Sequence, residues 1–74
     1  PYLALDKQSR VYLSDSGHNR VLAFGTDGTF LWSAGQTEDT GTPLQFPVGV
    51  AVSSNGRLYV SDAHTGRTVG FILP

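Results

Sequence analysis

LALDKQSRVYLSDSGHNRVLAF occupies residues 3–24, and 47 positions later residues 50–71 are VAVSSNGRLYVSDAHTGRTVGF. Seven of these 22 pairs are identical, and most of the other apolar positions exchange one aliphatic side chain for another. The chain of 74 residues therefore contains two copies of one unit. The identical pairs are Ala4/Ala51, Arg10/Arg57, Tyr12/Tyr59, Ser14/Ser61, Asp15/Asp62, Arg20/Arg67 and Phe24/Phe71.

Short apolar segments separated by turn residues predict β-strands, and no segment has the pattern of a helix. The Asp27-Gly28 and Asn55-Gly56 pairs are strong hairpin signals, because these residue types tolerate the positive φ of tight turns. The predicted strands are Tyr2–Asp6, Arg10–Ser14, Arg20–Phe24 and Thr29–Ala34 in the first unit, and Val48–Val52, Arg57–Ser61 and Arg67–Leu73 in the second.

A repeat of about 40–50 residues made of short strands is typical of β-propeller blades. Unbroken apolar runs such as Leu3-Ala4-Leu5 need burial on both faces of a sheet, which the stacking of blades supplies. We therefore expect an all-β chain of four-stranded antiparallel up-and-down blades: a first blade at 1–35, an inter-blade loop at 36–46 and a second blade at 47–74 that lacks its outer strand. Because about three or more repeats are normally required, we expect the propeller to be incomplete as a single chain.

The composition argues against several classes of partner. Five Lys and Arg oppose six Asp and Glu, so the chain lacks the basic excess expected of a nucleic-acid binder. No apolar run approaches the ~20 residues of a membrane span, so direct membrane insertion is not expected. The absence of cysteine fits either redox compartment. The partners that we expect are other protein chains, or copies of this chain, that complete the propeller.

The residues around the first predicted hairpin resemble the NHL repeat. The resemblance begins with VYLSDSGHNRV at 11–21, and FPVGVAV at 46–52 followed by GRLYVSD at 56–62 is similar to the opening half of a further repeat. The second copy departs from the pattern at His64-Thr65-Gly66. The resemblance spans about one and three-quarter blades and implies a propeller, a fold whose NHL members bind proteins, RNA or small ligands and occasionally catalyse. Further matching positions are Phe24, Asp27-Gly28, Phe30-Leu31 and Gly35.

A weaker resemblance, from Tyr12 to Phe71, is to the propeller of the peptidyl-hydroxyglycine amidating lyase, a zinc enzyme. That resemblance implies a histidine ligand after the proline that opens an inner strand, whereas Val48 follows Pro47 in this chain. A catalytic zinc usually takes three protein ligands, and the chain holds two histidines. We expect no catalytic residue, metal or cofactor, and a zinc-dependent lyase fragment is the alternative.

Two acid–base pairs recur at the turn between the second and third strands of each unit. The first is Asp15 with Arg20, and the second is Asp62 with Arg67. The hairpin should bring each carboxylate close to its guanidinium. Recurrence in both units favours a structural role for the pair in each blade over a catalytic one.

One rim of the predicted blades gathers polar loops. In an up-and-down blade, the turn after strand two and the segment leaving strand four emerge on the same face, so residues 15–19, 36–45 and 62–66 should share a rim. This rim is the candidate ligand-binding surface of a non-enzymatic scaffold or protein-interaction module. Recognition of a sugar or of RNA is the alternative, although single-stranded RNA prefers basic and aromatic side chains. The candidate rim residues are His18, Asn19, Gln36, Glu38, Asp39, Gln45 and His64.

Overall fold

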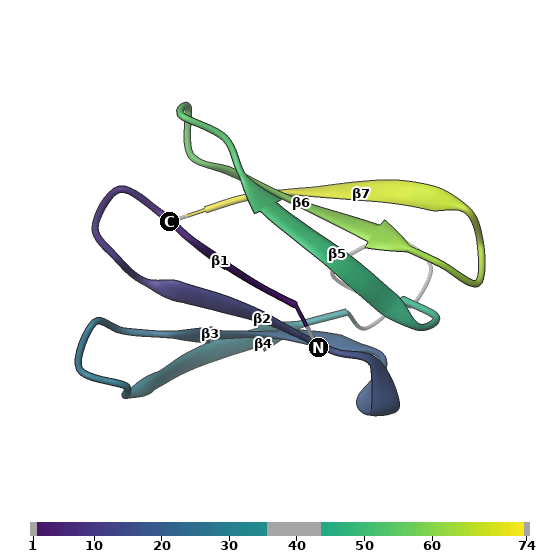
Figure 1. The fold of residues 1–74 in the computed structure, drawn as a ribbon, viewed down its shortest axis with the longest axis horizontal. Coiled ribbons are helices and arrows are strands. Elements are labelled where there is room, and N and C mark those ends of the chain that lie inside the picture. Colours follow the sequence, from purple (N-terminus) through teal and green to yellow (C-terminus); the bar gives the residue numbers. More distant parts are fainter. Residues whose placement is uncertain (1, 36–43, 74) are drawn as a thin grey trace.

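The computed structural model describes residues 2–35 and 44–73, and these residues form two antiparallel β-sheets. The first sheet has the strand order β1-β2-β3-β4 and the second β5-β6-β7, so neighbours in sequence are neighbours in each sheet. Figure 1 shows the two sheets packed on each other, with β1 and β5 side by side. The strands are β1 (Leu3–Leu5), β2 (Val11–Asp15), β3 (Arg20–Phe24), β4 (Phe30–Ala34), β5 (Pro47–Val52), β6 (Arg57–Asp62) and β7 (Arg67–Ile72).

The all-β fold predicted from the sequence is confirmed, and every predicted strand lies within one residue of an observed one. Gly28 and Gly56 adopt φ of 85° and 80° in the turns that close their hairpins, as the Asp-Gly and Asn-Gly signals predict. One short helical element was not expected. Ser16–His18 form a single 3-10 turn, η1, which ends at Asn19 in the left-handed conformation.

The core lies between the two sheets. Tyr12, Val21 and Ala23 of the first sheet and Leu58 and Val60 of the second are buried in one cluster. Trp32 of β4 packs against this cluster, with its ring centroid 5.9 Å from that of Tyr12. Burial alternates along β2 and β6, so each sheet turns one face to the other sheet.

Hydroxyl groups also join the sheets across the core. Ser14 Oγ accepts a hydrogen bond from the Tyr2 N–H at 3.0 Å and donates to the Val48 carbonyl at 3.0 Å. Ser16 Oγ donates to the Pro47 carbonyl at 2.5 Å. These bonds satisfy polar groups at the contact between β2 and β5 and fix how the sheets are placed on each other.

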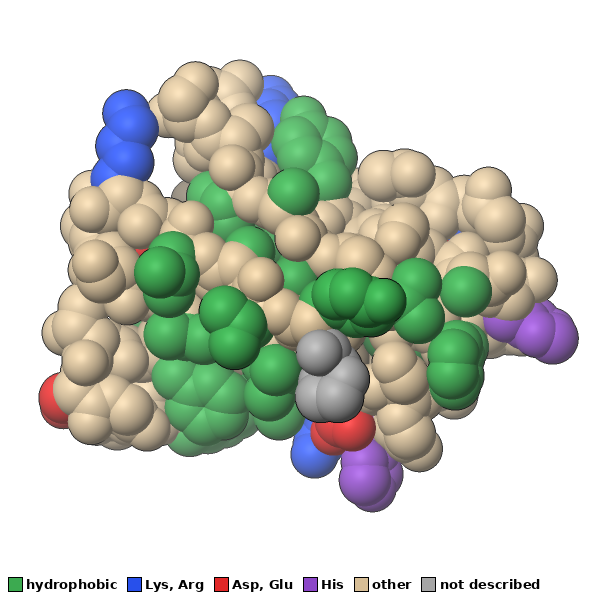
Figure 2. Space-filling view, in the orientation of Figure 1, with side chains coloured by type: hydrophobic (Ala, Val, Ile, Leu, Met, Phe, Trp, Pro, Cys, Tyr) green, Lys and Arg blue, Asp and Glu red, His purple; other side chains and the backbone are tan. Residues whose placement is uncertain are grey.

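Large apolar side chains remain in contact with solvent. Figure 2 shows hydrophobic side chains on the face turned to the viewer, over the region where β1 and β5 lie in Figure 1. Scattered single hydrophobic residues are ordinary on a protein surface, but contiguous patches mark contact sites. The exposed large hydrophobic residues are Tyr2, Leu3, Leu5, Phe30, Leu31, Phe46, Tyr59 and Ile72.

Candidate functional site at the polar rim

The segment Leu44–Phe46 is held between the two turns that the sequence placed on one rim. The Phe46 N–H donates to Asn19 Oδ1 at 2.8 Å, and the Gln45 N–H donates to Asp62 Oδ2 at 2.8 Å. The Gln45 carbonyl in turn accepts from the His64 N–H at 3.2 Å. Asn19, Gln45 and His64, three of the predicted rim residues, are thus brought together around Phe46.

A shallow hollow of about 340 Å³ lies among these residues, lined by Asn19, Gln45, Phe46 and His64. The other candidate residues lie elsewhere. The His18 imidazole is 3.1 Å from the Asp15 carboxylate and its side chain is largely in solvent. Gln36, Glu38 and Asp39 fall outside the described residues.

Phe46 is a rim residue that the sequence did not indicate. A residue before proline normally takes an extended conformation, yet Phe46 has a φ of 65°, and its side chain is 53% exposed. The backbone is held there from both sides, because the Phe46 carbonyl also accepts from the Ala63 N–H at 3.2 Å. Strained backbone of this kind costs about 1–3 kcal/mol and collects at functional sites. The exposed ring beside two amide side chains could stack on a flat ligand.

The two predicted acid–base pairs are cross-strand neighbours. Asp15 faces Arg20 across β2 and β3, with Arg20 Nε 3.0 Å from Asp15 Oδ2. Hydrogen bonds from His18, and then from Arg20, hold the pKa of the Asp15 carboxyl below its usual value. Asp62 faces Arg67 across β6 and β7 at 3.6 Å, and it is buried. The Asp62 carboxylate also anchors the Gln45 backbone, so this pair supports the rim.

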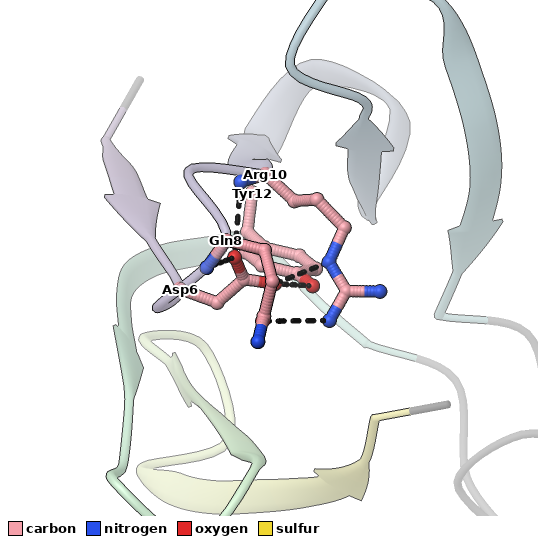
Figure 3. Close-up of polar contacts among 4 residues, drawn as sticks. All are labelled: Asp6, Gln8, Arg10 and Tyr12. Carbon is pink, nitrogen blue, oxygen red and sulfur yellow. Dashed lines mark hydrogen bonds and ion pairs between the residues drawn. The ribbon is translucent and has the colours of Figure 1, made fainter.

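A second polar cluster, centred on Asp6, lies at the opposite ends of the strands (Figure 3). Asp6 Oδ1 accepts from the backbone N–H groups of Gln8 and Arg10 at 2.9 and 3.0 Å. Asp6 Oδ2 accepts from Arg10 Nε at 2.5 Å and from the Tyr12 hydroxyl at 2.8 Å. One carboxylate therefore closes the β1–β2 turn and anchors the buried tyrosine.

The pKa values of this cluster follow from its hydrogen bonds. Burial raises the pKa of Asp6, but the bonds from Arg10, Tyr12 and Gln8 outweigh burial, and the net result is a pKa below the usual value. Burial, and then the bond to Asp6, raise the pKa of Tyr12 to about 12. All four of these hydrogen bonds converge on the Asp6 carboxylate, which therefore acts as a structural anchor of the first hairpin. A comparison of the two units does not reveal this cluster, because Ser53 occupies the position equivalent to Asp6 in the second unit.

The described part of the chain offers neither a metal centre nor a helical membrane span. Residues 2–35 and 44–73 contain no group of three or more His, Cys, Asp or Glu side chains placed to hold a metal ion. Within the same ranges, no helix has the length and apolar character needed to cross a membrane.

The second copy of the repeat matches a known family. Residues 44–71 match the family model of the NHL repeat. No curated protein matches the chain. Because the match falls on the second copy, the departure at His64-Thr65-Gly66 leaves the family pattern recognisable. The chain therefore carries an NHL repeat at residues 44–71, and its four- and three-stranded antiparallel sheets are those of a propeller-type repeat module.

Proposed function

We propose that this chain is a non-enzymatic propeller module that serves as a scaffold or protein-interaction surface, and that further blades complete it. The observation that carries the proposal is the exposure of apolar side chains on the outer side of the first sheet. Leu3, Leu5 and Phe30 are 63%, 56% and 54% exposed there. An apolar patch of this kind marks a surface that another element covers.

The size of the chain supports the same proposal. A domain of about 60 residues buries only about 60% of the surface that its unfolded chain exposes, so a chain of similar size gains little stability from its own core. No cysteine is present to add a disulfide. Blades in contact with further blades would gain the missing burial, as repeat units do in general. The added blades would come from copies of this chain or from the rest of a longer protein.

The experiment is the absolute mass of the purified chain by light scattering, together with its circular dichroism. A discrete multimer with a β-sheet spectrum would support completion by copies. A disordered monomer would support completion by a longer protein. A monomer that is fully folded, and that unfolds cooperatively at high denaturant, would contradict the proposal, because such a chain needs no further blade.

The rim hollow favours a second candidate function, recognition of a small neutral ligand such as a sugar. The exposed Phe46 ring offers a stacking surface, and the Asn19 and Gln45 amides can both donate and accept hydrogen bonds. Among the residues that the structure describes, no lysine or arginine lines this hollow, which disfavours RNA. The test is a titration with neutral oligosaccharides, followed by NMR at the His64 ring. Shifts that saturate would support this function, and shifts that appear only with oligouridine and vanish with salt would favour RNA instead.

A further inference from the structure

The two faces of each sheet differ in a way that repeats between the sheets. Cross-strand register places Ala4, Tyr12 and Ala23 in one row of the first sheet, and it places Ala51, Tyr59 and Gly70 in the equivalent row of the second. We call the side of each sheet that carries this row its tyrosine face. The opposite side, here called the aliphatic face, carries Leu5, Val11 and Phe24 in the first sheet and Val52, Leu58 and Phe71 in the second.

Inside the chain, unlike faces pack together. Tyr12, on the tyrosine face of the first sheet, is 1% exposed, and Leu58 and Val60, on the aliphatic face of the second, are fully buried. All three belong to one core cluster. The contact between the sheets is therefore heterologous: a tyrosine face lies against an aliphatic face.

Two faces are left without a sheet on them among the described residues. One is the aliphatic face of the first sheet, where Leu3 and Leu5 are more than half exposed. The other is the tyrosine face of the second sheet, where Tyr59 is 40% exposed. A hollow of about 260 Å³ opens on the tyrosine face, lined by Gly49, Val50, Ala51, Tyr59, Ser61 and Thr68. Each open face is the copy, 47 residues away, of a face that is buried inside the chain.

The hydroxyl of Ser61 shows how close this equivalence is. Ser61 Oγ accepts from the Gly49 N–H at 3.0 Å, just as its copy Ser14 Oγ accepts from the Tyr2 N–H at 3.0 Å. Ser14 then donates to a backbone carbonyl of the sheet that packs on it, that of Val48. No acceptor for the Ser61 hydroxyl is found in the described part of the chain, so the donor that joins two sheets at Ser14 remains available at Ser61.

We propose that a second copy of this chain stacks head to tail on the first, with the aliphatic face of its first sheet against the tyrosine face of the other copy's second sheet. The contact repeats the one inside the chain, and Ser61 donates to the backbone of the incoming copy. This inference rests on the proposed function and specifies the partner and the polarity of its interface. A heterologous contact can be extended, so copies add until a ring closes or a filament grows.

The test uses two variants that each block one face. Leu5→Glu places a charge on the open aliphatic face, and Tyr59→Glu places one on the open tyrosine face. Both side chains are substantially exposed in one copy, so the fold should persist, which circular dichroism and Trp32 fluorescence will check. Thr68→Glu and Leu3→Glu are the replacements if either variant fails to fold. Ser54→Glu, in the exposed β5–β6 turn, is the control with the same change of charge.

Sedimentation equilibrium is then measured for the wild-type chain, each variant alone and a 1:1 mixture. We expect the wild-type chain and Ser54→Glu to assemble, and each face variant alone to associate at least about tenfold more weakly, because burying an unpaired charge is costly. The mixture should form a complex of one copy each, since each variant keeps the face that the other lacks. Adding the double variant, Leu5→Glu with Tyr59→Glu, to either single variant should form no complex.

Other outcomes overturn the inference in recognisable ways. A Tyr59→Glu variant that still dimerises while Leu5→Glu does not would show a two-fold pairing of aliphatic faces, and the proposed function would stand. A wild-type chain that assembles, with both variants assembling equally well, would place the interface elsewhere. A disordered wild-type monomer would overturn stacking by copies but leave completion by a longer protein. A stable folded monomer would overturn both proposals.

Discussion

At the scale of single residues, the carboxylate of Asp6 determines the shape of the first hairpin. Its side chain is 5% exposed and accepts hydrogen bonds from two backbone N–H groups, a guanidinium and a phenol. Asp6→Asn places an amide N–H₂ against these donors, so we expect a loss of about 1–3 kcal/mol in the free energy of unfolding. Urea unfolding followed by Trp32 fluorescence measures the loss. Asp27→Asn, in an exposed turn, is the control: asparagine keeps the Oδ1 acceptor for the Thr29 N–H, so the stability should change by less than about 0.5 kcal/mol.

The same carboxylate predicts how stability responds to acid. Because folding lowers the pKa of Asp6, the unfolded chain binds a proton more readily than the folded chain. The stabilisation is present above the unfolded value of about 3.9 and is lost as the pH falls through the lower, folded value. Urea unfolding between about pH 5 and pH 2 should therefore show a steeper decline for the wild-type chain than for Asp6→Asn. Parallel declines would show that Asp6 has the same pKa in both states.

Tyr12 predicts the opposite dependence in alkali. Its folded pKa of about 12 lies above the usual value of about 10, so its contribution to stability is complete below pH ~10 and is lost as the pH rises toward 12. Absorbance at the tyrosinate band should show a late titration step that belongs to Tyr12. Tyr12→Phe should remove that late step, and Tyr59→Phe should leave it in place. A late step that survives in Tyr12→Phe would assign the raised pKa to another residue.

At the scale of elements, Gly35 fixes the end of β4 against the turn between β2 and β3. Its φ is 140°, and a Cβ there would lie 2.7 Å from the Asn19 carbonyl oxygen and 3.0 Å from Arg20 Cα. Since the neighbouring atoms are backbone, Gly35→Ala should lower the free energy of unfolding by about 1–3 kcal/mol. Gly17→Ala, in η1, is the matched control, because no atom lies within 4 Å of its added Cβ. Its effect should be below about 1 kcal/mol. Equal effects in urea unfolding would contradict the close contact at Gly35.

The strands could be predicted from the sequence because their signals are local. Gly28 and Gly56 mark their turns by residue type alone, and the apolar runs between turns have the length of strands. The Asp6 cluster could not be found by comparing the units, since Ser53 replaces the carboxylate. Nor could the sequence indicate which face of each sheet is buried. Both faces are apolar, and the two units carry a tyrosine at the same position, Tyr12 in the first and Tyr59 in the second. Their exposures of 1% and 40% come only from the placement of one sheet on the other.

At the scale of the whole molecule, stability and association should be linked. If the open faces are covered only when copies stack, the folded state is favoured by mass action, and the melting temperature rises with chain concentration. We expect this rise in calorimetry between about 10 µM and 1 mM for the wild-type chain and for Ser54→Glu.

Leu5→Glu should melt lower and independently of concentration, because its aliphatic face cannot be covered. A 1:1 mixture of Leu5→Glu and Tyr59→Glu should regain part of the dependence, since one of its two open interfaces can form. A wild-type melting temperature that stays constant over this range would show that folding does not depend on association between copies. The proposed stacking would then have no driving force.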